Sequence, residues 1–152
     1  MKISITQATT GDAATIFELQ KLAYKNEAEL YNDFDIPPLT QTLDEMKSDF
    51  ENKIFLKADV EGKIVGAVKA HQLNRVCFIE RLIVHPSFQG RGIGTLLMSR
   101  IEAHFEQAQR FELFTVHKSE RNIGLYQRLG YLMFKTEKIS ENLSFVFMEK
   151  RQ

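Results

Sequence analysis

The sequence predicts a single α+β domain, with an antiparallel first half that leads into a strand–turn–helix unit at the centre of the chain. Apolar residues alternate with polar ones in several segments, as in strands that bury one face. In other segments they recur three or four positions apart, as in amphipathic helices. Closely spaced glycines separate a long apolar segment from a helical one. The chain has 152 residues, of which 43% are hydrophobic, which is enough for one continuous core. We therefore expect one domain over 1–152.

The N-terminal third is expected to hold a short strand and two helices. Ile3 and Ile5 alternate with polar neighbours, and Thr9 begins a capping-box pattern that predicts a helix running through Tyr24. The acidic segment that follows is interpreted as a helix end or a loop, because it runs into two consecutive prolines. A second capping box, at Thr42, predicts the start of another short helix.

From position 53 the period changes from helical to alternating, so most of the remaining elements are expected to be strands. A Glu61-Gly62 turn between two alternating segments predicts a hairpin, and Gly130 is expected to stop the last helix. The expected strands are 54–60, 64–72, 76–84, 111–116, 132–136 and 144–148, and the expected helices are 93–105 and 122–129.

Charge and cysteine content narrow the possible function classes. Lys plus Arg and Asp plus Glu each number 20, so no net charge draws the chain to nucleic acid or to an anionic membrane, and neither is an expected partner. The single cysteine, Cys77, cannot form an internal disulfide, and no Cys/His cluster has the spacing of a zinc site, so no metal is expected. No apolar run resembles a signal peptide or approaches the ~20 residues of a membrane span. We expect a soluble, cytoplasmic protein.

Residues 89–95, QGRGIGT, predict an anion-binding turn. Glycines stand between an apolar strand and a helix, where the lack of Cβ atoms lets successive backbone N–H groups converge on one point. The helix N-terminus adds partial positive charge, and Gln89, Arg91 and Thr95 can add side-chain contacts. The glycine spacing differs from those of the nucleotide-hydrolase loop and of dinucleotide-binding folds. Taken alone, the segment could equally be a glycine-rich turn without a ligand.

Two longer motifs resemble those of the GNAT N-acetyltransferase superfamily. Residues 79–97, IERLIVHPSFQGRGIGTLL, are similar to its core motif, which runs from a strand ending in L-x-V-x-P through Q-G-R-G-x-G into a helix. Residues 122–131, NIGLYQRLGY, match its second motif, and the resemblance covers nearly the whole chain. It implies a three-layer α/β architecture, with a mixed, mainly antiparallel sheet of about six or seven strands between helices. The resemblance also implies a V-shaped splay between two central strands.

The same resemblance implies acetyl-CoA as the cosubstrate and assigns residues to it. In the superfamily, the strand at Leu82, Ile83 and Val84 lends its backbone to the pantetheine arm. The turn binds the pyrophosphate, which implies contacts from Gln89, Gly90, Arg91, Gly92, Ile93, Gly94 and Thr95. Many members have an asparagine where this chain has Ser119, so either Ser119 or Asn122 would supply the polar contact to the arm. Asn122 could instead cap its helix.

Tyr126 matches the superfamily tyrosine that protonates the departing CoA thiolate, which implies a general acid. A phenol suits that task because it is neutral at pH 7 yet can give a proton to a developing anion. The alternative is a helix tyrosine that packs beside Leu125 and Leu129.

The attacking amine must lose a proton, and Glu80 is the candidate general base. Strict alternation places Glu80 on the face of Phe78, Leu82 and Val84, an apolar setting that would raise the pKa of its carboxyl. Many superfamily members carry their base at or near this position. Two alternatives stay open: an ion pair between Glu80 and a neighbouring basic residue, and a β-bulge that would reverse the facing.

The histidines and the cysteine give weaker signals. His85 precedes the motif proline and is expected to be structural, whereas His71 or His117 could border the acceptor slot. Cys77 lies on an apolar strand with no adjacent base, so we expect it to pack in the core rather than to form an acyl-enzyme.

The resemblance places the acceptor near the N-terminal helices, where Tyr24, Tyr31 and Asp33 are the candidate substrate contacts. Carboxylates of this region, including Glu27 and Asp35, could attract a cationic amine, although a charged run can also be a solvated face. The predicted activity is transfer of an acetyl group from acetyl-CoA to a primary amine of a small molecule or peptide. The transfer is expected to proceed by direct attack in a ternary complex.

Two rival interpretations concern the use of the cofactor site. In the first, the chain is a non-catalytic regulatory module that binds acyl-CoA, which the presence of both Glu80 and Tyr126 disfavours. In the second, it modifies RNA or the termini of ribosomal proteins, although its balanced charge makes RNA less attractive. The sequence determines neither the acceptor nor the acyl chain, and it leaves a homodimer open.

Overall fold

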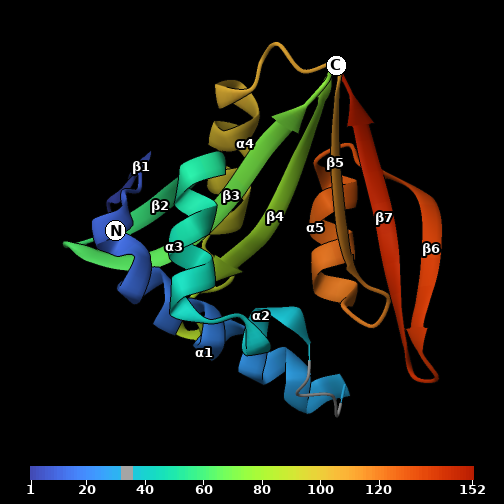
Figure 1. The fold of residues 1–152 in the computed structure, drawn as a ribbon, viewed down its shortest axis with the longest axis horizontal. Helices are drawn as coiled ribbons and strands as arrows, with labels where there is room; N and C mark the ends of the chain where they lie inside the picture. The colour runs from blue at the N-terminus through green and yellow to red at the C-terminus, as the bar shows by residue number, and fades with distance from the viewer. Residues whose placement is uncertain (32–35) are drawn as a thin grey trace.

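A seven-stranded sheet forms the centre of the computed structural model, which describes residues 1–31 and 36–152 (Figure 1). The strands are β1 Ile3–Gln7, β2 Ile54–Val60, β3 Lys63–Leu73, β4 Val76–Val84, β5 Arg110–Val116, β6 Leu132–Ser140 and β7 Leu143–Arg151. They lie in the order β1-β2-β3-β4-β5-β7-β6. All neighbouring pairs are antiparallel except β4 with β5, so the predicted mixed, mainly antiparallel sheet is confirmed.

Helices cover both faces of this sheet (Figure 1). They are α1 Ala13–Tyr31, α2 Pro37–Thr40, α3 Leu43–Asn52, α4 Ile93–His104 and α5 Glu120–Arg128, with short 3-10 turns η1 Thr10–Asp12 and η2 Pro86–Phe88. The first helix continues to Tyr31, beyond the expected end at Tyr24. The prolines begin a short helix as well as interrupting the chain, because the first position of a helix requires no N–H donor.

Capping boxes set the starts of two helical segments, as the sequence predicts. The Glu45 N–H donates to Thr42 Oγ1 over 3.1 Å, and the Thr42 N–H donates to the Glu45 carboxylate over 2.8 Å. The Thr9 N–H donates to the Asp12 carboxylate over 3.0 Å, so Asp takes the place of Glu. Such bonds satisfy N–H groups that have no partner within the helix.

Two hydrophobic clusters hold the helices against the sheet, one on each face. Ile93 and Leu97 of α4 pack in the larger cluster, which also contains Tyr126 of α5. Ile16 of α1 and Met46 of α3 pack in the second cluster, on the opposite face. The sheet is thus the middle of three layers, as expected.

The sheet splays open between β4 and β5. These strands pair only at 76–78 with 110–112, after which β4 continues to Val84 and β5 to Val116 without pairing with each other. Their divergence is visible in Figure 1, where α1 passes across the open end. A small cluster of Ala28, Ile36 and Leu143 joins this part of α1 to β7. The predicted V-shaped splay is confirmed.

A β-bulge interrupts β4 beside the splay. Residue 69 of β3 pairs with residue 80 and residue 67 with residue 83, so Arg81 and Leu82 together face a single residue of β3. Arg81 adopts the left-handed conformation, with φ of 54°. Because of the extra residue, the side chains of β4 after this point lie on the face opposite to the one that strict alternation would give them.

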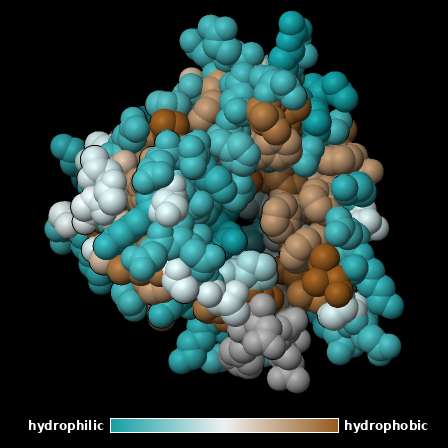
Figure 2. All heavy atoms as spheres, in the orientation of Figure 1, coloured by the Kyte–Doolittle hydropathy of each residue, from teal (hydrophilic) through white to brown (hydrophobic). Residues whose placement is uncertain are grey.

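The far edge of the sheet exposes apolar side chains. Figure 2 shows apolar atoms gathered over the half of the molecule that β5, β7 and β6 form, beside a hollow and a mostly hydrophilic surface on the other half. β6 is exposed along its whole length. The large apolar residues exposed on these strands are Phe114, Leu132, Met133, Phe134 and Ile139.

Candidate active site

A cleft of about 460 Å³ lies beyond the point where β4 and β5 separate. Its lining comes from α1, from the end of β4, from the glycine turn with the first residues of α4, and from α5 with the residues just before it. Its volume is in the range of sites that bind small molecules and cofactors. On the β5 side, the edge of β4 beyond Phe78 has no strand partner within the described residues, so its backbone groups are available to a ligand.

The glycine turn forms one end of this cleft, as the sequence predicts. Gly90 and Gly92 have φ of 77° and 81°, in the left-handed region where a side chain is strained. Gly92 is the N-cap of α4. Its carbonyl accepts a hydrogen bond from the Leu96 N–H, four residues later, as at the start of a regular helix. The N–H groups of the first helical residues have no partner inside the helix, an arrangement that in proteins commonly binds anions.

Most of the predicted cofactor contacts line the cleft together. They are Leu82, Ile83, Val84, Gln89, Gly90, Gly92, Ile93, Gly94, Thr95, Ser119 and Asn122. Arg91 is the exception, because its guanidinium lies over the Phe88 ring at 5.3 Å and donates to the Met1 sulfur over 3.5 Å.

Three basic residues of the cleft were not predicted. Lys118 lies just before α5, and Arg121 and Arg128 lie on it, where they supply positive charge to the lining. Arg121 donates to Gln89, so α5 contacts the glycine turn directly. The spacing of seven residues between the two arginines, two helical turns, is the sequence signal that could have placed them on one face.

Glu27 of α1 reaches the same cleft and binds both polar residues of the predicted cofactor contact. Its Oε1 accepts from Asn122 Nδ2 over 3.2 Å and from Ser119 Oγ over 3.4 Å. Burial raises the pKa of the Glu27 carboxyl, although these two hydrogen bonds act in the opposite direction. The N-cap of α5 is Ser119, so the alternative in which Asn122 caps the helix is wrong.

Tyr126 is buried beside the cleft rather than on its lining. Its ring lies edge-on to that of Tyr131, with centroids 6.0 Å apart, in the cluster that Leu125 and Leu129 border. Burial raises the pKa of the Tyr126 phenol, and the charges of Tyr24 and Glu27 raise it further, so the phenol is neutral. The packing described by the alternative is therefore present.

The facing predicted for Glu80 is wrong in part. Glu80 shares a face with Phe78, but the bulge at Arg81 turns Leu82 and Val84 to the opposite face, where they pack on the cluster of α4. Strict alternation fails here because the bulge adds one residue to the strand. Glu80 also does not line the cleft.

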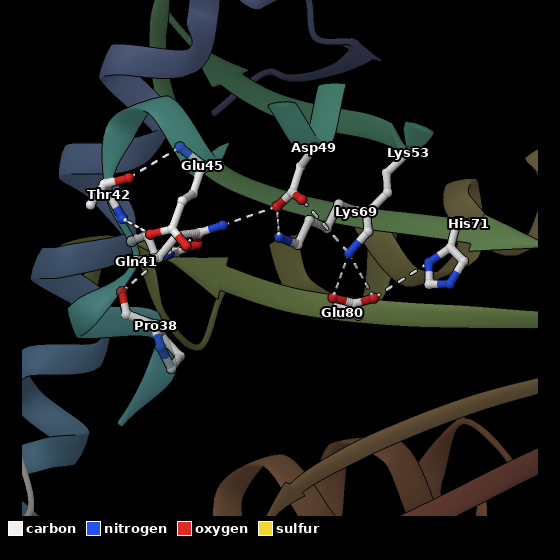
Figure 3. Close-up of polar contacts among 10 residues, drawn as sticks. Pro38, Gln41, Thr42, Glu45, Asp49, Lys53, Lys69, His71 and Glu80 are labelled. Carbon is white, nitrogen blue, oxygen red and sulfur yellow. Dashed lines mark hydrogen bonds and ion pairs between the residues drawn. The ribbon is translucent and has the colours of Figure 1, made fainter. Parts of the chain in front are cut away.

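Glu80 forms the ion pair that was left open as an alternative. Both of its carboxylate oxygens accept from Lys53 Nζ over 3.1 Å, and His71 Nδ1 lies 3.4 Å from Oε1 (Figure 3). The setting is thus charged rather than apolar. His71 stacks on Phe78, with ring centroids 5.4 Å apart, and so lies beside Glu80.

The polar contacts of Glu80 continue into a network that anchors α3 to the sheet (Figure 3). Asp49 lies 4.0 Å from Lys53 and accepts from the buried Lys69 over 2.7 Å and from Gln41 over 3.0 Å. Burial lowers the pKa of the Lys69 ammonium, although Asp49 opposes this shift. The network crosses from α3 to β3 and β4 on the face away from α4.

The remaining candidates have mixed placements. Tyr24 lines the cleft, whereas Asp33 and the side chain of Tyr31 lie outside the described residues. His117 Nδ1 accepts from the Ser144 N–H over 2.9 Å, which joins β5 to β7. Cys77 is fully buried, and burial raises the pKa of its thiol to about 12, so it stays protonated. In the described part of the chain, no helix is long and apolar enough to cross a membrane.

Comparison with known proteins gives a family match and a partial relative. The model of the acetyltransferase (GNAT) family matches residues 14–131. The UPF0157 protein YqkA of Bacillus subtilis (strain 168) is 28% identical over 131 residues, which cover 86% of this chain and 38% of that protein. The chain therefore spans well under half of the length of this relative.

Solved structures share the fold along nearly the whole chain. The paia N-acetyltransferase from Thermoplasma acidophilum, in complex with coenzyme A, has a TM-score of 0.84 at 15% identity, and the match covers 100% of both chains. The structure of yncA from Salmonella typhimurium with its cofactor acetyl-CoA has a TM-score of 0.79 at 18% identity, covering 99% of this chain and 94% of that one.

Proposed function

Because the chain belongs to the acetyltransferase (GNAT) family, we propose that it transfers the acetyl group of acetyl-CoA to a primary amine of a small molecule or peptide. The observation that carries this proposal is the cleft beside the splay, which joins an anion-binding helix start to an unpaired strand edge. A pyrophosphate fits the first and the amides of a pantetheine arm fit the second. The relatives solved with coenzyme A and acetyl-CoA support the same cofactor.

The reaction is direct attack of the amine on the thioester in a ternary complex. Tyr126 gives its proton to the departing thiolate, because its buried phenol is neutral and Asn122, one helical turn before it, lines the cleft. Glu80 is one candidate for the base, and because it contacts Lys53 and His71 outside the cleft lining, it would act through water.

The acceptor contacts extend this proposal toward α1. We propose Tyr24, which lines the cleft, together with Tyr31 and Asp33, as the residues that meet a cationic amine. The exposed apolar side chains of β6 are where a homodimer would form. A cytoplasmic location suits a chain whose single, buried thiol needs no oxidising compartment.

Thiol release from acetyl-CoA across a panel of amines tests the activity. We expect release with at least one primary amine, an acetylated product by mass spectrometry, and a preference for polycationic acceptors over neutral ones. Binding of acetyl-CoA without thiol release for any amine would instead support a regulatory module.

The acid role of Tyr126 has its own test in the Tyr126→Phe variant. We expect kcat to fall by about 10²-fold, the lower range for loss of a positioned proton donor, with an unchanged Kd for acetyl-CoA. Tyr131→Phe is the matched control, because it removes a second buried phenol 6.0 Å away that donates to Glu102 instead. Equal kcat values for the two variants would mean that Tyr126 only packs.

A further inference from the structure

We infer that Glu27, rather than Glu80, takes the proton from the acceptor amine, and that Ser119 and Asn122 position its carboxylate for this step. The inference rests on the proposed acetyl transfer and assigns the base within it. Glu27 lines the cleft, whereas Glu80 lies outside the lining, in contact with Lys53 and His71.

Among the described residues, the hydrogen bonds of Glu27 engage only one of its two carboxylate oxygens. Asn122 and Ser119 both donate to Oε1, at 3.2 and 3.4 Å. Oε2 makes no hydrogen bond to any residue that the structure describes. A carboxylate fixed through one oxygen and open at the other is arranged to accept a proton from a bound molecule.

The position of Glu27 matches the place where the amine must arrive. Asn122, which holds Glu27, lies one helical turn before Tyr126 on the same face of α5. The hydrogen bond of 3.2 Å from Asn122 Nδ2 to Glu27 Oε1 thus brings Glu27 to the turn of α5 that leads to Tyr126. The residue that protonates the leaving thiolate and the residue that deprotonates the amine would therefore serve one thioester carbon.

The electrostatic surroundings of Glu27 suit a base better than those of Glu80. Burial raises the pKa of its carboxyl, and both of its described hydrogen-bond partners, Ser119 and Asn122, are uncharged. The charged residues of the cleft, all on α5 or just before it, form no ion pair with Glu27 in the described structure. They are Lys118, Glu120, Arg121 and Arg128. By contrast, Lys53 occupies both oxygens of Glu80.

The proton and bond changes balance in this scheme. The ammonium gives one proton to Glu27, and the neutral nitrogen then forms a bond to the thioester carbon. The carbon–sulfur bond breaks, and the thiolate takes the proton of Tyr126. The new amide nitrogen loses its extra proton to the Tyr126 phenolate, and Glu27 releases its own proton to water. The sum is one ammonium and one thioester converted to one amide, one thiol and one proton.

The Glu27→Gln variant tests the assignment, because glutamine keeps an oxygen that accepts from Ser119 and Asn122 but cannot take a proton. With an alkylamine at pH 7, we expect kcat/KM to fall by about 10²-fold, with an unchanged Kd for acetyl-CoA. The loss should shrink as the pH rises through the pKa of the amine. It should also shrink with a hydrazide acceptor, which is already neutral at the assay pH. Glu29→Gln is the matched control, since Glu29 is exposed on the same helix.

Further outcomes separate this inference from its rivals. If Glu27→Gln is as active as wild type, the assignment is overturned. It is also overturned if Glu27→Gln changes the Kd for acetyl-CoA but leaves kcat unchanged. The same amine-dependent loss in Glu80→Gln instead would return the role to Glu80. A wild type that releases no thiol with any amine counts against the proposed function itself. If Glu27→Gln fails to fold, Glu27→Ala should recover activity on addition of formate, and failure of that rescue in a folded variant contradicts the inference.

Discussion

Burial of the Glu27 carboxyl implies a cost in stability that can be measured apart from activity. Burial raises its pKa above the ordinary 4.5, so the folded state binds the proton more tightly than the unfolded state. The free energy of unfolding therefore falls as the pH rises from 4.5 through the folded-state pKa, and the penalty is complete above it. We expect Glu27→Gln to have a higher Tm than wild type at pH 7.

The Tm advantage of Glu27→Gln should disappear below pH 4, where wild-type Glu27 is protonated in both states. Thermal melts between pH 3 and 8 check this, with the exposed Glu29→Gln as the control that should follow wild type throughout. A wild type that is the more stable at pH 7 would mean that the ionised carboxylate is stabilised, contrary to the burial of this group. Proteins commonly accept such a cost at functional residues.

At the same residue scale, sequence predicted the types of group but not all of their partners. Tyr126 and the polar pair of Ser119 and Asn122 were identifiable because the motif is contiguous along the chain. The contacts of Glu27 with that pair span 92 and 95 positions, so no local pattern indicates them. The facing of Glu80 failed for a related reason, because a bulge forms through pairing with the neighbouring strand.

Among the elements, the turn before α4 allows backbone strain to be separated from ligand binding. Gly92→Ala places a side chain at φ of 81°, which costs about 1–2 kcal/mol and should lower Tm by roughly 2–4 °C per kcal/mol. We also expect the Kd for acetyl-CoA to rise about tenfold, or ~1.4 kcal/mol, because the shifted backbone misplaces N–H donors.

Gly62→Ala is the matched control for Gly92→Ala. It has φ of 79° in the β2–β3 turn, and neither glycine has a heavy atom within 4 Å of the added Cβ. The strain should be similar, but Gly62 does not line the cleft. Calorimetric titration and thermal melts compare the two variants. An equal loss of affinity in both would mean that the turn contributes stability rather than ligand contacts.

Elements with strong local signals were predicted well, and those governed by tertiary contacts were not. The β2–β3 hairpin follows from the turn at its tip, and the start of α3 follows from a capping box. Each of these two signals involves residues only a few positions apart. The extension of α1 to Tyr31 was missed because its second half is rich in polar residues. Ala28 holds that half in place through a cluster with Ile36 and Leu143, which are distant in sequence from one another.

At the scale of the whole molecule, α1 joins the two halves of the split sheet. Its first half packs with Met46 and Ile83 on the side of β4, and Ala28 packs with Leu143 on the side of β7. Between them lies the cleft, with one wall on β4 and the other on α5. A ligand that contacts both walls should therefore tie the halves together and raise the stability of the whole domain.

Saturating acetyl-CoA should raise the stability of the domain in a way that depends on both ends of the ligand. At a concentration of 100 times Kd, binding to the folded state alone adds about 2.7 kcal/mol. For a chain of this size, that corresponds to a rise in Tm on the order of 5–10 °C. Amide hydrogen exchange should slow in the glycine turn, in α5 and in the second half of α1, while β6, which is exposed along its length and contributes no residue to the cleft lining, should exchange as before. Inorganic pyrophosphate is the control, since it can occupy the helix start without reaching β4 or α1. If pyrophosphate alone reproduces the full rise in Tm and the protection of α1, the strand edge contributes nothing to cofactor binding.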